Sequence, residues 1–173
     1  MKKEHLVAYF DEAAASRDAW KRRNWYYHWN VERLLQFLVP AWETVLEMGS
    51  GTGDLLAALK PKRGVGLDLS ERMTAVAKAK YPQMEWITGD AENLKIGEQF
   101  DWVVMSDLVG FLDDIEQAFS NLNRVTHPRS KVVITHYNYL WEPVLRLAEL
   151  LHLKEKQPLQ NWLSPKDIEN MLY

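Results

Sequence analysis

A glycine-rich turn, Glu47-Met-Gly-Ser-Gly-Thr-Gly53, is the feature that most constrains what this chain can fold into. It follows a short apolar run at 44–47 and precedes a helical pattern that begins at Asp54. Glycines at alternate positions let the backbone turn sharply and keep side chains away from a ligand. The helix after such a turn points unpaired N–H groups and the positive end of its dipole at that ligand. The pattern therefore predicts a binding crevice at the carboxyl end of a strand, with Glu47 at its rim.

Strand and helix patterns alternate after residue 44, which predicts an α/β fold with a parallel sheet covered by helices. We expect five strands, at 44–47, 63–68, 84–88, 101–106 and 130–136. We expect helices at 54–60, 70–80, 113–123 and 142–152, and before the sheet at 4–20 and from Asn24 to about Val39. The aromatic run Trp25–Trp29 is expected between the two N-terminal helices. The length suits one domain, with a helical cap at 1–41, a core at 42–137 and a helical tail at 138–173.

Two more acids follow predicted strands and face the same crevice. Asp68 lies 21 residues after Glu47, the spacing at which an acid accepts hydrogen bonds from a ribose diol. Asp90 follows the third strand, where it can accept a hydrogen bond from an exocyclic adenine amine while a following N–H donates to a ring nitrogen. Alone, Asp90 would be a turn residue; beside Glu47 and Asp68 it indicates a nucleoside site.

These motifs, in this order and spacing, resemble those of class I S-adenosylmethionine-dependent methyltransferases. The segments that match are Glu47–Gly53, Asp68, Gly89–Glu92 and Phe100–Ser106, and the resemblance covers about residues 42–137. It implies a three-layer α-β-α Rossmann-like fold with strand order 3-2-1-4-5. It also implies S-adenosylmethionine as the cofactor and methyl transfer to an oxygen or nitrogen of a small molecule. The cofactor-binding residues that it implies are Glu47, Gly49, Ser50, Gly51, Gly53, Asp68, Leu69, Asp90, Ala91 and Ser106.

Within that resemblance Glu47 would orient the turn or meet the cofactor's amino group. The glycines would lie under the methionine part, Asp68 at the ribose, Asp90 with Ala91 at the adenine, and Ser106 at the methyl end.

Two alternatives compete with this interpretation. A nicotinamide or flavin dehydrogenase also uses a glycine turn and a ribose acid, but its third glycine or alanine falls one position later than Gly53. Asp54 occupies that position here and would crowd and repel a pyrophosphate, which favours the methyltransferase. A domain that binds the cofactor without catalysis, as an interaction or regulatory module, is the other alternative.

An oxygen nucleophile, or an ammonium, also needs a general base. Asp107 and His136, after the fourth and fifth strands, are the candidates, although Asp107 could instead cap a helical turn and His136 could bond backbone. Tyr26, Tyr27 and His28 form either a packing cluster or a lid over cofactor or substrate. No spacing of histidines or acids matches a metal site, so no metal is expected.

Composition excludes several classes of protein. The net charge is −3 and the basic cluster Lys21-Arg22-Arg23 is short, so we expect a solvated helix face and no nucleic-acid partner. Cysteine is absent, which excludes disulfide and thiolate chemistry. No apolar run reaches the ~18 residues of a membrane span, and the N-terminus does not resemble a signal peptide. A cytoplasmic protein is therefore the default expectation.

The C-terminal segment departs from the family pattern. Ser164 and Pro165 resemble the start of the family's last helix, which two further strands follow, whereas this sequence stops at Tyr173. We therefore expect a C-terminally truncated chain whose fifth strand is an exposed sheet edge. A further C-terminal domain or a homodimer would cover that edge. The phrases around Tyr26–His28 and Asn161–Ser164 resemble methyltransferase domains that precede a glycosyltransferase domain, which suggests a sugar- or lipid-related acceptor.

Overall fold

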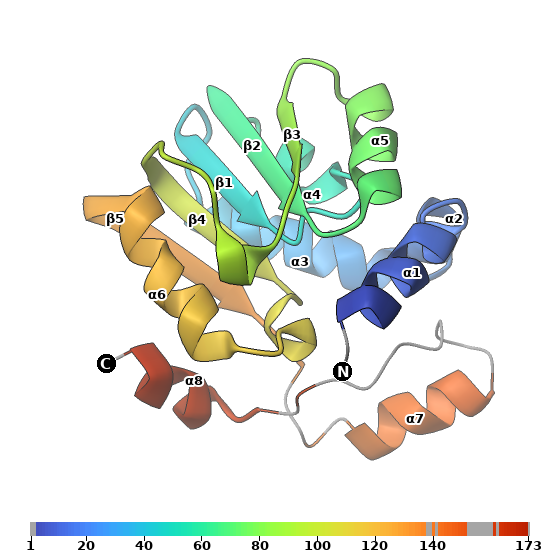
Figure 1. Ribbon diagram of the computed structural model, residues 1–173. Helices are drawn as coiled ribbons and strands as arrows, with labels where there is room; N and C mark the ends of the chain where they lie inside the picture. The colour runs from blue at the N-terminus through green and yellow to red at the C-terminus, as the bar shows by residue number, and fades with distance from the viewer. Residues whose placement is uncertain (1–2, 138–139, 141, 152–160, 162, 173) are drawn as a thin grey trace.

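The computed structural model describes residues 3–137, 140, 142–151, 161 and 163–172. Five parallel strands form one sheet in the order β3-β2-β1-β4-β5, with helices against both of its faces (Figure 1). The strands are β1 Thr44–Met48, β2 Arg63–Asp68, β3 Glu85–Thr88, β4 Phe100–Ser106 and β5 Thr126–Thr135. This confirms the α/β class, the Rossmann-like layering and the predicted strand order. In the described residues β5 is one edge of the sheet and β3 is the other.

Three helices precede the sheet, and the others connect or follow its strands. The first three are α1 Lys3–Ala13, α2 Arg17–Arg23 and α3 Trp25–Leu38. The others are α4 Asp54–Ala58, α5 Glu71–Lys80, α6 Ile115–Val125, α7 Glu142–Leu150 and α8 Pro165–Leu172, with short 3₁₀ turns η1 Ala91–Asn93 and η2 Val109–Phe111. Figure 1 shows α1 and α2 beside the carboxyl ends of β1 and β2. They lie where the predicted crevice should be.

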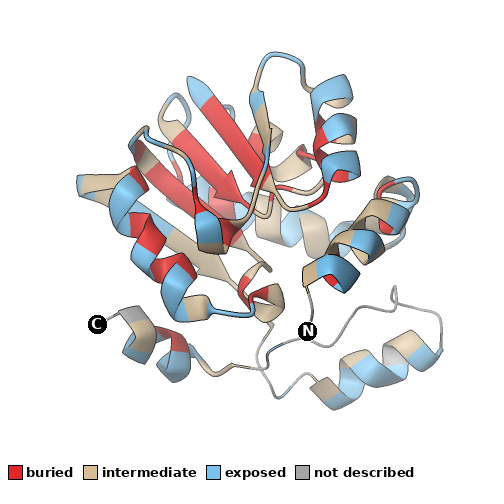
Figure 2. Ribbon diagram, viewed as in Figure 1, coloured by how far each residue is buried: buried red, intermediate tan, exposed pale blue. Residues whose placement is uncertain are grey.

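The core lies on both faces of the three central strands, which are the most deeply buried part of the molecule (Figure 2). On one face α6 and α8 pack against Leu46, Val103 and Met105. On the other face α3 and α4 pack against Val45 and Val104. Burial on both faces explains why these strands are continuous apolar runs rather than alternating ones. It also holds the strand ends, and the residues that follow them, in fixed places.

The predicted N-terminal helices were partly wrong. The expected helix at 4–20 is two helices, because the chain turns at 14–16 and α2 begins after Ser16. The aromatic run is not a connection: Trp25 is the first residue of α3. Asn24 precedes α3, but its amide donates to the carbonyl oxygen of Trp20 in α2 and makes no capping bond to α3. Aromatic residues have a weak intrinsic helix propensity, which favours a connection at 25–29. Tertiary packing outweighs that propensity here, because the Leu35 side of α3 is buried in the core.

Strand β5 begins four residues before the predicted start, at Thr126. Phe100 pairs with Thr126 but Trp102 pairs with Lys131, so the ladder has an irregularity that contains Pro128. Ser130 spans this bulge, since its hydroxyl accepts from His127 N and donates to Phe100 O. Proline cannot donate a hydrogen bond to the ladder and interrupts it locally. The sequence pattern therefore indicated a strand only after Pro128.

Candidate functional site

The glycine turn has a backbone that glycine alone adopts easily. Gly49, Gly51 and Gly53 have φ of 78°, 52° and 84°, in the left-handed region. The turn is tied to the end of β2: Asp68 Oδ2 accepts from Gly51 N at 2.7 Å and Oδ1 accepts from Ser70 N at 2.9 Å. Both oxygens of Asp68 are therefore oriented by backbone N–H groups, and the turn and the acid form one rigid unit.

The glycines contact different neighbours. A Cβ on Gly51 would have no heavy atom within 4 Å, so this peptide faces open space. A Cβ on Gly53 would lie 2.5 Å from the Trp86 ring, and one on Gly49 would lie 3.0 Å from Leu108. Gly51 thus leaves room for a ligand, whereas Gly53 leaves room for a side chain of β3.

Glu47 is buried beneath the turn, 2% exposed. Its Oε2 accepts from Leu56 N at 3.0 Å, so it holds the first turn of α4, the helix that follows the glycine turn. Burial raises the pKa of Glu47 to about 8. Ser50 is also buried, and its hydroxyl lies against Gly66 beneath the turn.

A cavity of about 440 Å³ lies at the carboxyl ends of β1, β2 and β4, under α1, α2 and the start of α3. It brings most of the predicted site residues together: Gly49, Gly51, Asp68, Leu69, Asp90, Ala91, Ser106, Asp107, Tyr27 and His28. Five predicted residues are not in its lining: Glu47, Ser50, Gly53, Tyr26 and His136. Tyr26 is 64% exposed on the outer side of α3.

Asp90 precedes η1 and caps it, since its Oδ1 accepts from Glu92 N at 2.9 Å. Lys3 of α1 reaches across the cavity mouth to the other oxygen of Asp90, and to Glu92 Oε2 at 2.8 Å. The amide of Asn121 donates to Ala91 O at 3.0 Å, which holds this segment from the opposite side. Lys3 of α1 therefore lines the cavity beside Asp90 and Glu92 and forms ion pairs with both.

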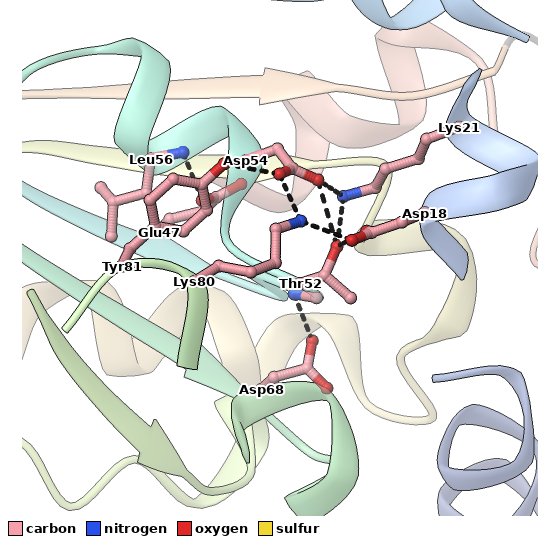
Figure 3. A network of polar contacts seen from close by, with 10 residues as sticks. Asp18, Lys21, Glu47, Thr52, Asp54, Leu56, Asp68, Lys80 and Tyr81 are labelled. Carbon is pink, nitrogen blue, oxygen red and sulfur yellow. Dashed lines mark hydrogen bonds and ion pairs between the residues drawn. The ribbon is translucent and has the colours of Figure 1, made fainter. Parts of the chain in front are cut away.

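Asp54 does not lie where the sequence argument placed it. Its carboxylate accepts from Lys21 Nζ at 2.8 Å, Lys80 Nζ at 2.6 Å and the Tyr81 hydroxyl at 2.7 Å (Figure 3). Asp18 joins the same network through Lys80 and the hydroxyl of Thr52. Asp54 is absent from the cavity lining, so it does not crowd a ligand there.

The network joins α2 to the turn and to α5. Although burial alone would raise the pKa of the Asp54 carboxyl, Lys21 and Lys80 hold it well below its usual range. Lys21 also lines the cavity, which corrects the expectation of a wholly solvated basic cluster; Arg22 and Arg23 are exposed as expected.

Asp107 follows β4 with a φ of 54°, a strained backbone for a residue with a side chain. The Tyr27 hydroxyl donates to its Oδ2 at 2.6 Å, and the Tyr27 ring stacks on Tyr137 at 5.2 Å. Burial next to Asp107 raises the pKa of Tyr27 far above its usual range, so the phenol keeps its proton. Asp107 does not cap the following turn, since the residue before η2 is Leu108.

His28 lies half-buried in the cavity wall beside Tyr27. Burial, together with the positive charges of Lys21 and Arg17, lowers the pKa of His28 to about 4. The imidazole is therefore neutral at physiological pH. His136 instead lines a separate small hollow with Asp107 and Tyr137, and its Nδ1 lies 3.1 Å from Tyr137 O.

Sequence reasoning missed the cavity residues of the N-terminal helices and the tail. They are Lys3, Leu6, Phe10, Arg17, Trp20, Lys21, Asn24, Tyr137 and Leu145. No glycine motif or strand end marks them. The one available signal was the aromatic enrichment at both ends of the chain, which is where Phe10, Trp20 and Tyr137 lie.

Within the described residues no group of three or more histidine and acidic side chains is arranged to hold a metal ion. None of the helices in the same part of the chain is long and apolar enough to cross a bilayer.

The cavity suits a nucleoside with a zwitterionic tail. The Gly51 peptide is open to a ligand, Asp68 presents an oriented carboxylate, and Asp90 lies at the next strand end. A comparison with family models matches residues 46–134, slightly more than half of the chain, to the methyltransferase domain family. The chain belongs to the class I S-adenosylmethionine-dependent methyltransferases. S-Adenosylmethionine is the cofactor of this family, and the residues present fit it.

Curated relatives support this membership. Demethylmenaquinone methyltransferase of Chlorobaculum parvum is 31% identical over 118 residues, which are 66% of this methyltransferase and 49% of that protein. Malonyl-[acyl-carrier protein] O-methyltransferase of a Marinomonas species is 31% identical over 142 residues, covering 77% and 52% respectively. The methyltransferase chain spans about half the length of these relatives.

Solved structures share the fold. An S-adenosylmethionine-dependent methyltransferase of Thermotoga maritima, described as a possible histamine N-methyltransferase, superposes with a TM-score of 0.81 at 19% identity. The match covers 97% of this methyltransferase and 79% of that chain.

Proposed function

We propose that this chain transfers the methyl group of S-adenosylmethionine to an oxygen or nitrogen of a small molecule. The observation that carries the proposal is a single cavity that joins the glycine turn and Asp68 to the Tyr27–Asp107 pair at the end of β4. One end of it has groups for a nucleoside, and the other has groups for a reacting acceptor. Bound there, S-adenosylmethionine supplies a methyl group that is already strongly electrophilic.

The protein's main task is then to position the reactants, which can lower such a barrier by ~7–11 kcal/mol. Asp68 would hold the ribose hydroxyls with the lone pairs that its two backbone bonds leave. Gly49 and Gly51 would admit the methionine part, and Asp90 with Ala91 would hold the adenine. Ser106 would lie beside the methyl end, where its hydroxyl is held 3.0 Å from that of Thr135.

Asp107 is the better-placed general base of the two predicted candidates. It lines the cofactor cavity, whereas His136 lines only the small hollow that it shares with Asp107 and Tyr137. The protonated Tyr27 hydroxyl holds one carboxylate oxygen of Asp107 in place. We infer that Tyr27, with the neutral His28, forms part of the acceptor wall rather than a detached lid.

The acceptor itself stays a proposal. The relatives' names mention a quinone precursor and an acylated carrier protein, which are chemically unlike. A sugar- or lipid-related molecule, as the sequence suggested, is one class to include in an acceptor panel.

Calorimetric titration tests the cofactor. We expect heat with S-adenosylmethionine and none with NAD, and we expect Asp68→Ala to weaken S-adenosylmethionine binding by about 100-fold or more. Glu71→Ala, an exposed acid three residues away, is the matched control and should leave the affinity unchanged. No heat with wild-type protein and S-adenosylmethionine would contradict the proposal.

Turnover separates an enzyme from a cofactor-binding module. S-Adenosylhomocysteine release would be measured against hydroxyl, amine and carboxylate acceptors. Tight cofactor binding with no turnover on any acceptor would favour the module.

A further inference from the structure

A second hollow meets the cofactor cavity at the end of β4. This α3–α4 groove has a volume of about 800 Å³ and runs between α3 on one side and α4 with the end of α5 on the other. Its lining shares five residues with the cofactor cavity: Lys21, Tyr27, His28, Ser106 and Asp107. The candidate reacting centre can therefore be approached from two sides.

Methyl transfer needs such an arrangement. The nucleophile must attack the methyl carbon on the side opposite the sulfur, so donor and acceptor have to reach one point from opposite directions. A cavity that holds the cofactor at Asp68 and a groove that ends at Asp107 supply two separate paths to that point.

The walls of the groove are aromatic and aliphatic. Trp25 and Trp29 of α3 are 61% and 42% exposed, and their rings lie 6.4 Å apart at the outer end. Leu55 and Ala57 of α4 line the opposite wall. Such surfaces gain free energy by covering a flat or extended apolar group.

The charges along the groove balance. Three acidic and three basic side chains line it: Asp18, Glu32, Asp54, Lys21, Arg22 and Lys80. Four of the six bond one another in the network of Figure 3. A groove with balanced and mutually bonded charges offers little attraction to a strongly charged ligand and favours an uncharged one.

We propose that the α3–α4 groove binds the methyl acceptor, an uncharged molecule with an aromatic or extended apolar body and a hydroxyl nucleophile at one end. The body lies against Trp25 and Trp29, and the hydroxyl reaches Asp107. This inference rests on the proposed function. In the reaction the hydroxyl oxygen forms the bond to the methyl carbon, the carbon–sulfur pair remains on sulfur, and the hydroxyl proton passes to the Asp107 carboxylate.

The absence of cysteine allows the groove to be blocked at one atom. Ala57→Cys would be labelled with N-phenylmaleimide, and Ser120→Cys, exposed on α6, is the matched labelled control. The probe is 2-naphthol, an uncharged aromatic hydroxyl, titrated calorimetrically into protein saturated with S-adenosylmethionine. We expect labelled Ala57→Cys to lose about tenfold or more in 2-naphthol affinity, with S-adenosylmethionine affinity within about twofold of wild type.

A second pair of variants checks the aromatic wall without a label. Trp29→Ala should weaken 2-naphthol binding by about tenfold, whereas Phe37→Ala should leave it unchanged. Phe37 is a fair control because it is 86% exposed on the same helix and does not line the groove.

Three results would overturn the groove assignment while the S-adenosylmethionine isotherm stays intact. They are equal 2-naphthol affinity in both labelled proteins, competition between 2-naphthol and S-adenosylmethionine, and no 2-naphthol binding up to its solubility. An absence of heat with S-adenosylmethionine would instead overturn the proposed function and this inference with it.

Discussion

The two sides of the proposed reacting centre differ in the kinds of residue that form them. The proposed cofactor side consists of a backbone turn, the buried Glu47 and a charge network. Asp68 accepts from two backbone N–H groups, Glu47 accepts from one, and Asp54 accepts from two lysines and a tyrosine. The proposed acceptor side consists of aromatic rings on α3. Trp25, Tyr26 and Trp29 lie against one another at 5.8–6.4 Å and remain exposed.

This difference has a physical reason. A buried polar group must be hydrogen-bonded or the fold loses free energy, so the cofactor side cannot vary without cost. An exposed ring contributes little to folding, so the α3 aromatics are free to serve binding. We therefore expect substitutions on the cofactor side to change stability, and substitutions of the exposed aromatics to leave it nearly unchanged.

Gly53→Ala should have the largest effect on stability among substitutions in the turn and its charge network. The new methyl group would lie 2.5 Å from the Trp86 ring, on a backbone with φ of 84°. Overpacking and left-handed strain together should cost about 3 kcal/mol or more, measured by urea unfolding. Gly97→Ala, where no atom lies within 4 Å, should change stability by less than about 0.5 kcal/mol. Equal stability of the two variants would contradict the rigid turn.

Asp54→Ala should come next. It leaves Lys21 and Lys80 facing each other without their shared carboxylate, and the Asp54 side chain is 26% exposed. We expect a loss of about 2 kcal/mol that shrinks at high salt. Glu85→Ala removes an exposed pair with Arg63 and should cost less than about 0.5 kcal/mol. A salt-independent loss would mean that packing rather than charge carries the effect.

Glu47 should make stability fall with rising pH. The pKa of Glu47 is about 8 in the folded protein, whereas its ordinary value is 4.5. Between pH 4.5 and pH 8 the folded state therefore keeps the Glu47 proton, which the unfolded state releases. The stabilisation is fully present below pH 4.5 and is lost as the pH rises to 8, by at most about 1.4 kcal/mol per pH unit. Unfolding curves of wild type and Glu47→Gln between pH 5 and pH 9 measure this. Parallel pH profiles would argue against a protonated Glu47.

The smallest change is expected at the aromatic face. Trp25→Ala should alter the free energy of unfolding by less than about 0.5 kcal/mol, because the side chain is 61% exposed. Leu35→Ala, on the buried side of the same helix, should cost about 2–5 kcal/mol. A large loss of unfolding free energy in Trp25→Ala would mean that the aromatic cluster stabilises the fold, which would contradict its role as a binding surface.

Much of the cofactor side was predictable from local patterns. The glycine spacing predicted the turn, and Ser70 is a residue type that commonly caps helices; it caps α5 by accepting from Met73 N at 3.1 Å. Asp68 and Asp90 were expected at strand ends in a shared crevice, and both line the cavity. Parallel strands put their carboxyl ends at one edge, so position in the strand was enough.

The contacts of Asp54 and Lys21 were not predictable in that way. From its position after the glycine turn, the Asp54 side chain was expected to point toward a bound ligand. In the structure its carboxylate points instead toward Lys21 of α2 and Lys80 of α5. Lys21 was expected to be solvated because it belongs to a basic cluster with Arg22 and Arg23. In the structure Lys21 lines the cavity, whereas Arg22 and Arg23 are exposed. Sequence spacing cannot say which side of a short helix meets a turn some 30 residues away.

The sequence by itself determined the sheet, the glycine turn and the acids that follow its strands, because each depends on periodicity or spacing within about 20 residues. The tertiary structure decided the pairing of Tyr27 with Asp107 at the proposed reacting centre. Tyr27 and Asp107 are 80 residues apart and meet because α3 and β4 pack on the same core. Contacts of that kind follow from how whole elements pack, which no local pattern encodes.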